Sequence, residues 1–455
     1  MMRSFSLAEI EASLHGHLQG ASVEFGGVGT DSRQVRAGDL FVALSGANFD
    51  GHDYLDDVAQ KGAVAALVSR DVESTLPLLR VADTQRALGL LGAYNRALFA
   101  NPVVAITGSS GKTTVKNMLA SVLGQRGNTL ATQGNYNNEI GVPLTLLRLA
   151  PEHDFAVVEM GAGRAGDIRW LCELGKPTVS VLLNAMAAHL DGFGSVEGIA
   201  QAKGEIFDQL GAGDTAIINA DQPWSAAWRE RAGEAAILDF GMHNDAAVKA
   251  RDINVRGVNG VSFTADTPAG DMLIDLALPG EHNVMNALAA IAAGLACQLS
   301  PLEIASGLRS VAAVEGRLAR HQSAAGTTVI DDCYNANPGS VRAAIDLLAT
   351  CPGHRTLVLG AMRELGADSA ALHREMGEQA RAAGIDRLWG VGPELEVCVD
   401  AFGEGGSFFP DRYAALSSLQ EQFEPGDAVL VKGSRSAGME LILQALLADD
   451  QAGEG

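Results

Sequence analysis

Short apolar runs alternate with amphipathic stretches along most of the chain. Runs that predict buried strands lie at 38–44, 62–68, 102–107, 155–160, 178–184 and 214–219. After the run at 102–107, apolar residues recur at the spacing of one helix face, at Val115, Met118, Leu119 and Val122. A chain in which strands and helices alternate usually folds into a parallel sheet covered by helices. The pattern therefore predicts the α/β class.

The pattern changes twice in the second half of the chain. Residues 248–278 show partial alternation around turn signals, which predicts antiparallel hairpins appended to the parallel sheet. From about 320 the first pattern returns. It predicts strands at 327–332, 356–362, 387–392 and 428–434, a helix opened by Pro338 and a helix over 367–383 ended by Gly384. A chain of 455 residues has room for about three domains, and we predict domains at 1–98, 99–315 and 316–455.

The charge balance narrows the range of partners. The chain has 33 Lys and Arg against 55 Asp and Glu, a formal net charge of −22. This excess of acid argues against binding to nucleic acid or to an anionic membrane surface. The longest nearly apolar window, 285–297, is too short to span a bilayer. The N-terminus has no continuous apolar stretch of the kind a signal peptide needs. The five cysteines have no metal-ligand spacing, which favours a reduced, cytoplasmic setting.

The sharpest local signal is the sequence TGSSGKTT at residues 107–114, between a predicted strand and a predicted helix. Such a turn exposes backbone N–H groups at a helix N-terminus, where phosphate binds well. Lys112 supplies a positive charge for phosphate oxygens, and Thr113 supplies a hydroxyl for Mg²⁺. The common P-loop has a further glycine at the position of Ile106. Even so, the strand–turn–helix setting favours phosphate binding over a plain turn.

Two residues after neighbouring strands are candidate metal ligands. Glu159 stands at the end of the run 155–160, where a Mg²⁺ ligand beside a P-loop is expected. By itself an acid in that place is more often a solvated surface residue. His189 follows the next predicted strand, and a lone histidine is usually structural.

Polar residues elsewhere allow both a functional and a structural interpretation. Three asparagines stand close together at 134–143, as they also do in ordinary polar loops. Asn283 and Asn286 lie three positions apart at a predicted helix start, where helix capping and contact with a ligand are both open and do not exclude each other. Arg317 and Asp332 have the positions of residues at a domain edge.

Taken together and in this order, the motifs resemble those of the Mur ligase family, whose members make peptide bonds on the cell-wall precursor. The matching segments are GTDSRQVRAGDLFVAL, ITGSSGKTTVK, GNYNNEIGVPLTLL, VVEMGAG, AHLDGFGS, AKGEIF, LPGEHNVMNALAA, EGR and DDCYNANPGSV. They cover residues 29 to about 342, and VLGAMRELG and VLVKGSRS extend the match to about 436. Folylpolyglutamate synthases share the TGSSGKTT type of loop. GNYNNEIGVP and DDCYNANPGS are more specific and favour the members that add D-alanyl-D-alanine.

The resemblance implies a fold and a set of roles. It implies a small N-terminal α/β domain for the UDP part of the substrate, a central P-loop ATPase-like domain and a Rossmann-like C-terminal domain. The ATP phosphates would be held by Gly108, Ser109, Ser110, Gly111, Lys112, Thr113 and Thr114. The rest of the nucleotide would meet Asn283, Asn286, Arg317 and Asp332. The UDP moiety would meet Asp31, Ser32 and Arg33, and the muramoyl peptide would lie near Asn135 and Asn138.

The resemblance also implies the metal site and the catalytic residues. Magnesium, as two ions, would be organised by Thr113, Glu159, His189 and Lys203. Among these residues and Lys112, the resemblance gives catalytic roles to Lys112, His189 and Lys203. In sister ligases the lysine that matches Lys203 is carbamylated, and we expect the same modification here.

The implied activity is ATP-dependent ligation of D-alanyl-D-alanine to a UDP-N-acetylmuramoyl-tripeptide through an acyl phosphate, in peptidoglycan precursor synthesis. Three alternatives stay open: the sister ligase that adds the third residue, a folylpolyglutamate synthase-like ligase, and a non-enzymatic nucleotide-dependent switch. The chain has no Asn-Lys pair from which the guanine-reading NKxD motif of GTPase switches could be built. We further predict a monomer.

Overall fold

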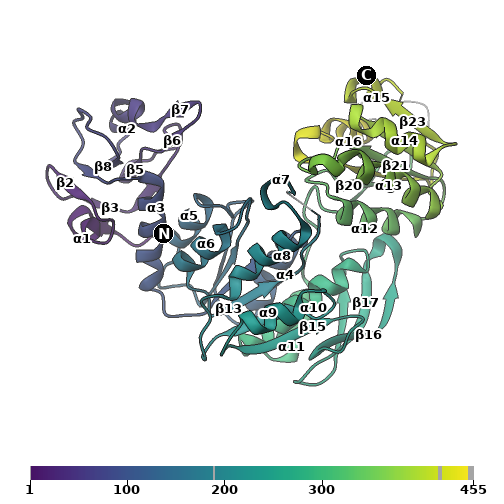
Figure 1. The fold of residues 1–455 in the computed structure, drawn as a ribbon, viewed down its shortest axis with the longest axis horizontal. Helices are drawn as coiled ribbons and strands as arrows, with labels where there is room; N and C mark the ends of the chain where they lie inside the picture. Colours follow the sequence, from purple (N-terminus) through teal and green to yellow (C-terminus); the bar gives the residue numbers. More distant parts are fainter. Residues whose placement is uncertain (1, 188–189, 419–422, 449–455) are drawn as a thin grey trace.

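Three blocks of α/β structure follow one another along the chain (Figure 1). The computed structural model describes residues 2–187, 190–418 and 423–448. The N-terminal and C-terminal blocks stand at opposite ends of the central one, so that the molecule is open on one side. Each block has its own sheet and its own buried apolar clusters. Among the described residues, no helix combines the length and the apolar character needed to cross a bilayer.

The N-terminal block is built on a five-stranded sheet. Its strands, in spatial order, are β2 (His17–Gln19), β9 (Leu78–Arg80), β8 (Ala65–Val68), β5 (Asp39–Val42) and β4 (Gly27–Gly29). All neighbours are parallel except β2 and β9. The predicted strands at 38–44 and 62–68 are β5 and β8, and both are almost wholly buried. Between them lie a 3-10 turn, η1 (Gly51–Tyr54), and helix α2 (Leu55–Gln60).

A long helix connects this block to the next. Helix α3 (Thr84–Ala97) begins at the side-chain cap of Asp83, which accepts a hydrogen bond from the Arg86 backbone. The helix packs against α5 (Gly141–Leu147) and α6 (Asp167–Gly175) of the central block. The N-terminal block is therefore joined to the central block by helix packing as well as by the chain.

The central block has a nine-stranded sheet in which all neighbours are parallel except the last two pairs. In spatial order the strands are β11 (Thr129–Ala131), β12 (Phe155–Glu159), β10 (Val103–Thr107), β13 (Val179–Leu182), β14 (Thr215–Asn219), β15 (Ala236–Gly241), β16 (Val248–Val255), β17 (Val261–Asp266) and β18 (Met272–Leu276). The predicted hairpin region is confirmed, because β16, β17 and β18 pair antiparallel. They continue the parallel sheet, since β16 also pairs parallel with β15.

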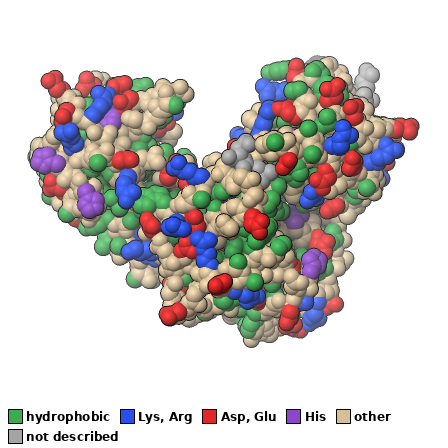
Figure 2. Space-filling model, in the orientation of Figure 1, with side chains coloured by type: hydrophobic (Ala, Val, Ile, Leu, Met, Phe, Trp, Pro, Cys, Tyr) green, Lys and Arg blue, Asp and Glu red, His purple; other side chains and the backbone are tan. Residues whose placement is uncertain are grey.

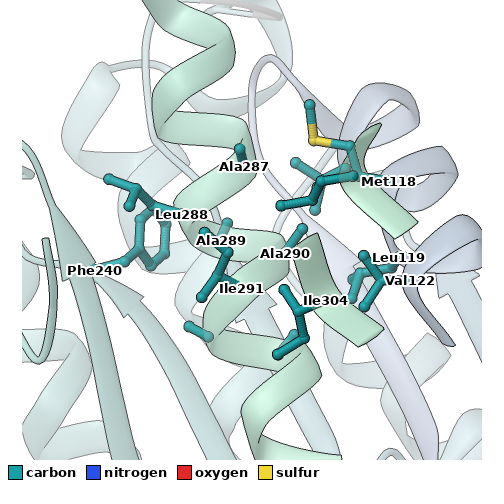
Figure 3. Close-up of a cluster of buried hydrophobic side chains, with 14 of the residues drawn as sticks. Met118, Leu119, Val122, Phe240, Ala287, Leu288, Ala289, Ala290, Ile291 and Ile304 are labelled. Atoms are coloured by element: carbon teal, nitrogen blue, oxygen red, sulfur yellow. The ribbon is translucent and has the colours of Figure 1, made fainter. Parts of the chain in front are cut away.

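One helix fills the centre of this block. Helix α10 (His282–Ala296) is apolar around most of its circumference, and it lies between the sheet and two other helices, α4 (Lys112–Leu123) and α11 (Pro301–Arg309) (Figure 3). The predicted face of α4 is confirmed, because Val115, Met118, Leu119 and Val122 are fully buried. Small residues along α10, such as Ala290, let these helices approach closely.

The C-terminal block is a second open sheet with helices on both faces. In spatial order its strands are β19 (Ala319–Gln322), β20 (Thr328–Asp332), β24 (Ala428–Lys432), β21 (Arg355–Gly360), β22 (Arg387–Val391) and β23 (Gly406–Phe409). All neighbours are parallel except β19 and β20. As predicted, Pro338 opens a helix, α12 (Pro338–Ala349), which Asn337 caps. The predicted helix at 367–383 is α13 (Ser369–Ala382), and a 3-10 turn, η4 (Gly366–Asp368), precedes it.

Candidate active site

A deep cleft lies where the central and C-terminal blocks meet. Its volume is about 690 Å³. The central block contributes the loops after β10, β12 and β13 and the start of α10, and the C-terminal block contributes residues 316–340 and Lys432. Parallel α/β sheets bind ligands beyond the carboxyl ends of their strands, and this cleft is in that place for both sheets. The space-filling view shows the broad hollow between the two end blocks of the molecule (Figure 2).

The glycine-rich loop between β10 and α4 has a fixed shape. Gly111 has a φ of +84°, which glycine adopts without strain, and α4 begins directly after it. Asn184, just beyond β13, accepts a hydrogen bond from the Ser110 N–H and donates one to the Ser110 carbonyl. The Ser109 hydroxyl donates to the Met186 carbonyl at 3.1 Å. The loop is thus anchored to the neighbouring strand end, as a preorganised phosphate cradle requires.

Lys112 occupies the end of this loop. Its Nζ donates to the Gly108 carbonyl at 2.6 Å, so the side chain folds back over the turn. Burial lowers the pKa of Lys112, while nearby Glu159 acts in the opposite direction. The ammonium lines the cleft together with Gly108, Ser109, Ser110, Gly111, Thr113 and Thr114, which are the predicted phosphate-binding residues.

Thr113 and Glu159 are brought together from different elements. The Thr113 hydroxyl donates to Glu159 Oε2 at 2.9 Å, and Asn137 Nδ2 donates to Glu159 Oε1 at 2.8 Å. Glu159 is buried, with 2% of its surface exposed. It is therefore not the solvated surface acid that a strand-end position alone would suggest. Among the described residues, no group of three or more His, Cys, Asp and Glu side chains could hold a metal ion.

That donor set is nevertheless suitable for one kind of metal. A hydroxyl and a carboxylate next to a phosphate-binding loop are hard oxygen ligands. Mg²⁺ is normally held by one or two protein carboxylates together with phosphate oxygens and waters, and does not need a cage made by the protein alone. Thr113 and Glu159 fit Mg²⁺ on these grounds.

Arg317 reaches the same place from the C-terminal side. Its Nη2 donates to the Thr113 hydroxyl at 2.9 Å, and its guanidinium lies 4.2 Å from the ring centre of Tyr334. The stacking on Tyr334 orients the planar guanidinium toward the glycine-rich loop. The structure thus brings together Arg317 and the loop that the sequence separates by about 200 positions.

Asp332 and Lys432 form a buried ion pair at the bottom of the cleft. They are register partners at the carboxyl ends of β20 and β24, and Lys432 Nζ donates to Asp332 Oδ2 at 2.5 Å. The same Nζ donates to the Asn335 carbonyl. Burial raises the pKa of Asp332, and the Lys432 ammonium opposes that rise. A buried pair of this kind holds both strand ends at a fixed spacing.

Asn283 and Asn286 line the cleft at the start of α10. Asn283 Nδ2 donates to the Pro279 carbonyl, and Asn286 Nδ2 donates to Asn283 Oδ1. The helix N-cap is Glu281, without a side-chain capping bond. The capping interpretation of the two asparagines is therefore wrong. A Cβ at Gly111 would lie 2.5 Å from Asn286 Oδ1, so a side chain at this position of the loop would displace Asn286.

Lys203 is buried on α8 (Val196–Gly204), with 3% of its surface exposed. It lines the cleft, and no hydrogen bond or ion pair of its Nζ is found within the described part of the chain. Burial lowers the pKa of Lys203 well below its usual value, and the Lys112 ammonium lowers it further. A buried lysine without a carboxylate partner is rare, and it marks this position as more than a surface residue.

The other predicted site residues have different positions. Asn135 and Asn138 both line the cleft. Asn138 Oδ1 also accepts hydrogen bonds from the Ile140 and Gly141 backbones at the start of α5. His189 lies outside the described residues.

Asp31, Ser32 and Arg33 lie on the N-terminal block and do not line the cleft. The Arg33 guanidinium holds the Asp31 carboxylate with two hydrogen bonds and lowers the pKa of Asp31 to about 2. The Ser32 carbonyl accepts a hydrogen bond from Lys61 Nζ.

Sequence reasoning missed four polar residues of the site. Asn137 contacts Glu159, Asn184 anchors the glycine-rich loop, and Lys432 pairs with Asp332. The fourth, Lys116, is buried on α4 and donates to the Gly134 carbonyl at 3.2 Å. A signal for Lys116 was present, because it lies four positions after Lys112 and therefore on the same face of the helix.

A strand is followed by a glycine-rich loop and then by a helix that begins with Lys112 and Thr113. This arrangement defines a P-loop type of α/β protein. Comparison with known proteins is more specific. Three family descriptions match: "Mur ligase family, catalytic domain" at residues 24–93, "Mur ligase middle domain" at 106–294 and "Mur ligase, glutamate ligase domain" at 316–435. The chain belongs to the Mur ligase family, whose members are ATP-dependent, amide-forming ligases.

Individual relatives match over the whole length. The UDP-N-acetylmuramoyl-tripeptide–D-alanyl-D-alanine ligase of Escherichia coli K12 is 45% identical over 98% of this chain and 99% of its own. A crystal structure of MurF from Acinetobacter baumannii superposes with a TM-score of 0.94 at 36% identity, covering 98% of this chain and 99% of that one. MurF from Thermotoga maritima in complex with ADP has a TM-score of 0.83 at 29% identity, covering 93% and 97%.

Proposed function

We propose that the chain joins D-alanyl-D-alanine to a UDP-N-acetylmuramoyl-tripeptide with consumption of ATP, in the synthesis of peptidoglycan precursors. The observation that carries this proposal is the end-to-end identity of 45% with the E. coli ligase of that name. The cleft supports it independently. Lys112, Thr113 and Arg317 line the cleft, and these side chains suit a transferring phosphoryl group. Polar residues of the central and C-terminal blocks lie beside them.

The chemistry of the proposed reaction explains why the cleft needs positively charged side chains. A carboxylate is a poor acyl donor because its leaving group would be oxide. Transfer of the γ-phosphoryl group of ATP to the carboxylate oxygen gives an acyl phosphate and ADP. The free amine of D-alanyl-D-alanine then attacks the acyl carbon, the C–O bond to phosphate breaks, and the amine loses a proton as the amide forms. The first step brings an anion against a polyanion, so Lys112 and Arg317 neutralise charge there.

The proposed metal is magnesium. Thr113 and Glu159 would hold it, the resemblance adds His189 to them, and a carbamylated Lys203 would hold a second ion. Bound Mg²⁺ would neutralise negative charge on the phosphates. Asn137 would keep the Glu159 carboxylate turned toward Thr113.

We further assign the remaining contacts and the domains by the same resemblance. Domain 1–98 would bind UDP through Asp31, Ser32 and Arg33. Domain 99–315 would bind ATP, with Asn283 and Asn286 facing adenine. Domain 316–455 would contribute Arg317 and Asp332 to the nucleotide. Asn135 and Asn138 would lie near the muramoyl peptide.

We also propose a monomeric enzyme of the cytoplasm. ATP and nucleotide-linked precursors are cytoplasmic metabolites. The five cysteines are all free and buried, which suits a reducing compartment.

An acceptor panel tests the proposed function. Release of ADP is measured with UDP-N-acetylmuramoyl-tripeptide and, separately, with the corresponding dipeptide and with a folate as acyl donors. Each donor is offered D-alanyl-D-alanine, a diamino acid or glutamate. We expect rapid turnover only for the tripeptide with D-alanyl-D-alanine. Preference for the dipeptide with a diamino acid, or for folate with glutamate, would replace the proposal with a sister activity, and nucleotide hydrolysis without acceptor dependence would indicate a switch.

A further inference from the structure

A second groove adjoins the ligation cleft at the boundary between the N-terminal and central blocks. It has a volume of about 490 Å³ and lies between the start of α3 and the loop that precedes α6. Glu139 and Asp167 line both this groove and the ligation cleft, so the two are adjacent. The groove thus lies beside the ligation cleft, on the side of the N-terminal block.

Arg86 is held in the groove with its hydrogen-bonding edge free. Its guanidinium carbon lies 4.9 Å from the ring centre of Trp170, so the side chain is stacked on the indole. Within the described part of the chain, no hydrogen bond or ion pair of this guanidinium is found. Trp170 is itself fixed, because its ring packs over Gly89, where a Cβ would lie 2.9 Å from the ring. Stacking orients a guanidinium and leaves its N–H groups available in the ring plane.

Arg164, in the loop before α6, also lines the groove. It pairs with Asp167 through Nε at 3.2 Å, which leaves the two terminal nitrogens of the guanidinium to face other partners. Three of the backbone N–H groups around it already donate hydrogen bonds. Asp167 Oδ2 accepts from Gly163 and Arg164, and Glu205 accepts from Gly166. The charged donors for an added anion are therefore the two arginines, and Gln85 adds a neutral amide to the lining.

The groove also contains acidic side chains. The Asp83 carboxylate caps α3, and the Asp167 carboxylate caps the loop, so both are already engaged with backbone N–H groups. The third, Glu139, is exposed and lies where the groove opens into the ligation cleft. The lining of the groove therefore has three carboxylates and two guanidinium groups, a mixed charge that suits a peptide with both acidic and amino groups.

We propose that this groove is a subsite for a free carboxylate of the peptide in the acyl substrate, bound by Arg86 and Arg164. The inference rests on the proposed function. A related A. baumannii enzyme is named UDP-N-acetylmuramoylalanyl-D-glutamyl-2,6-diaminopimelate–D-alanyl-D-alanyl ligase. In such a peptide the glutamyl residue keeps one carboxylate after it is linked, and diaminopimelate keeps one besides the carboxylate that is activated. Planar carboxylates are the ligands that guanidinium groups bind with two parallel hydrogen bonds.

The test is equilibrium binding of three nucleotide-peptides by calorimetry, without ATP. One is the free acid, one is amidated at the glutamyl carboxylate, and one is amidated at the distal diaminopimelyl carboxylate. We expect wild type to bind one amidated peptide about tenfold to a hundredfold more weakly than the free acid, as loss of charge-assisted hydrogen bonds requires. The peptide that loses affinity identifies which carboxylate occupies the groove.

The variant Arg86→Gln separates recognition from packing. It is expected to weaken binding of the free acid to the level of the sensitive amidated peptide, while binding of that peptide changes little. Arg80→Gln, which removes an exposed ion pair with Asp71 elsewhere in the same block, is the matched control and should keep the wild-type preference.

Equal binding of all three peptides by wild type would overturn the proposal, and so would equal weakening of all three by Arg86→Gln. Ligation of D-alanyl-D-alanine is measured separately with the free acid. A chain that discriminates the peptides but does not ligate would refute the proposed function and leave the subsite standing. A chain that ligates without discriminating would do the reverse.

Discussion

Arg317 donates a hydrogen bond to the hydroxyl of Thr113, and this contact connects the C-terminal block to the phosphate loop of the central block. The same Thr113 hydroxyl donates a hydrogen bond to Glu159. A residue at the domain edge therefore touches the group that we propose as a magnesium ligand. The position of the C-terminal block and the geometry of the phosphate site are coupled through one side chain.

Replacing Arg317 should damage catalysis more than substrate binding. We expect Arg317→Ala to lower kcat about a hundredfold, because one preorganised charge at the phosphoryl group is lost. Arg317→Lys should restore only part of the rate, since an ammonium neither stacks on Tyr334 nor offers a planar fork. Steady-state kinetics check both variants. A rate for Arg317→Ala close to wild type would contradict this role.

Lys112→Ala should abolish ligation and leave binding of the UDP-peptide nearly intact, because the proposed UDP contacts lie on a different block. The expected loss of rate is at least about a hundredfold. Calorimetry with the UDP-peptide and an ADP-release assay measure the two effects. Near-normal turnover would remove Lys112 from the phosphate site.

Asn137→Ala should raise the magnesium requirement. Its amide holds one oxygen of Glu159, and loss of such a supporting bond typically weakens metal binding about tenfold or more. A titration of activity against Mg²⁺ should show a higher concentration at half-maximal rate, with a similar rate at saturation. Asn101→Ala, which removes an exposed hydrogen bond to the His153 carbonyl, is the control. An unchanged Mg²⁺ dependence would mean that Asn137 has no part in holding Glu159.

Lys203 should be carbamylated. The neutral amine attacks CO₂, an N–C bond forms, and one proton leaves to solvent, which gives an oxygen anion suited to Mg²⁺. Burial favours the neutral amine. Labelling with carbon-13 bicarbonate should give a carbamate signal in nuclear magnetic resonance that is lost in Lys203→Ala. That variant should lose most of its activity, and short carboxylates should restore part of it. Lys249→Ala is the control. Full activity of Lys203→Ala in CO₂-free buffer would exclude the modification as a requirement.

The sequence predicted most strands of the central and C-terminal sheets and missed short or partly exposed ones. Strands β10, β12 and β20 are buried along nearly their whole length, so their composition identifies them. Strand β11 has only three residues, and β15 begins with exposed positions, so neither has a clear pattern. Pairing of β16 with β15 depends on tertiary structure and could not be read from local periodicity.

The site was predictable where a motif fixes the geometry and not elsewhere. The P-loop type of loop specifies Lys112 and Thr113 through their neighbours in sequence. By contrast, the asparagines of the segment 134–143 look alike in a sequence. Only the fold shows that Asn137 donates to Glu159, while Asn138 accepts a hydrogen bond from the backbone at the start of α5. The partner of Lys432 is 100 positions away, and their pairing depends on the order of strands in the sheet.

The most direct test of the account follows the oxygen atoms of the tripeptide carboxylate. The carboxylate is labelled with oxygen-18 and turned over with ATP and D-alanyl-D-alanine. The masses of the phosphate and peptide products are then measured by mass spectrometry. The account predicts one labelled oxygen in each inorganic phosphate, one in the new amide, and a product heavier by the D-alanyl-D-alanine unit. Unlabelled phosphate, or ADP formed without that product, would contradict ligation through an acyl phosphate.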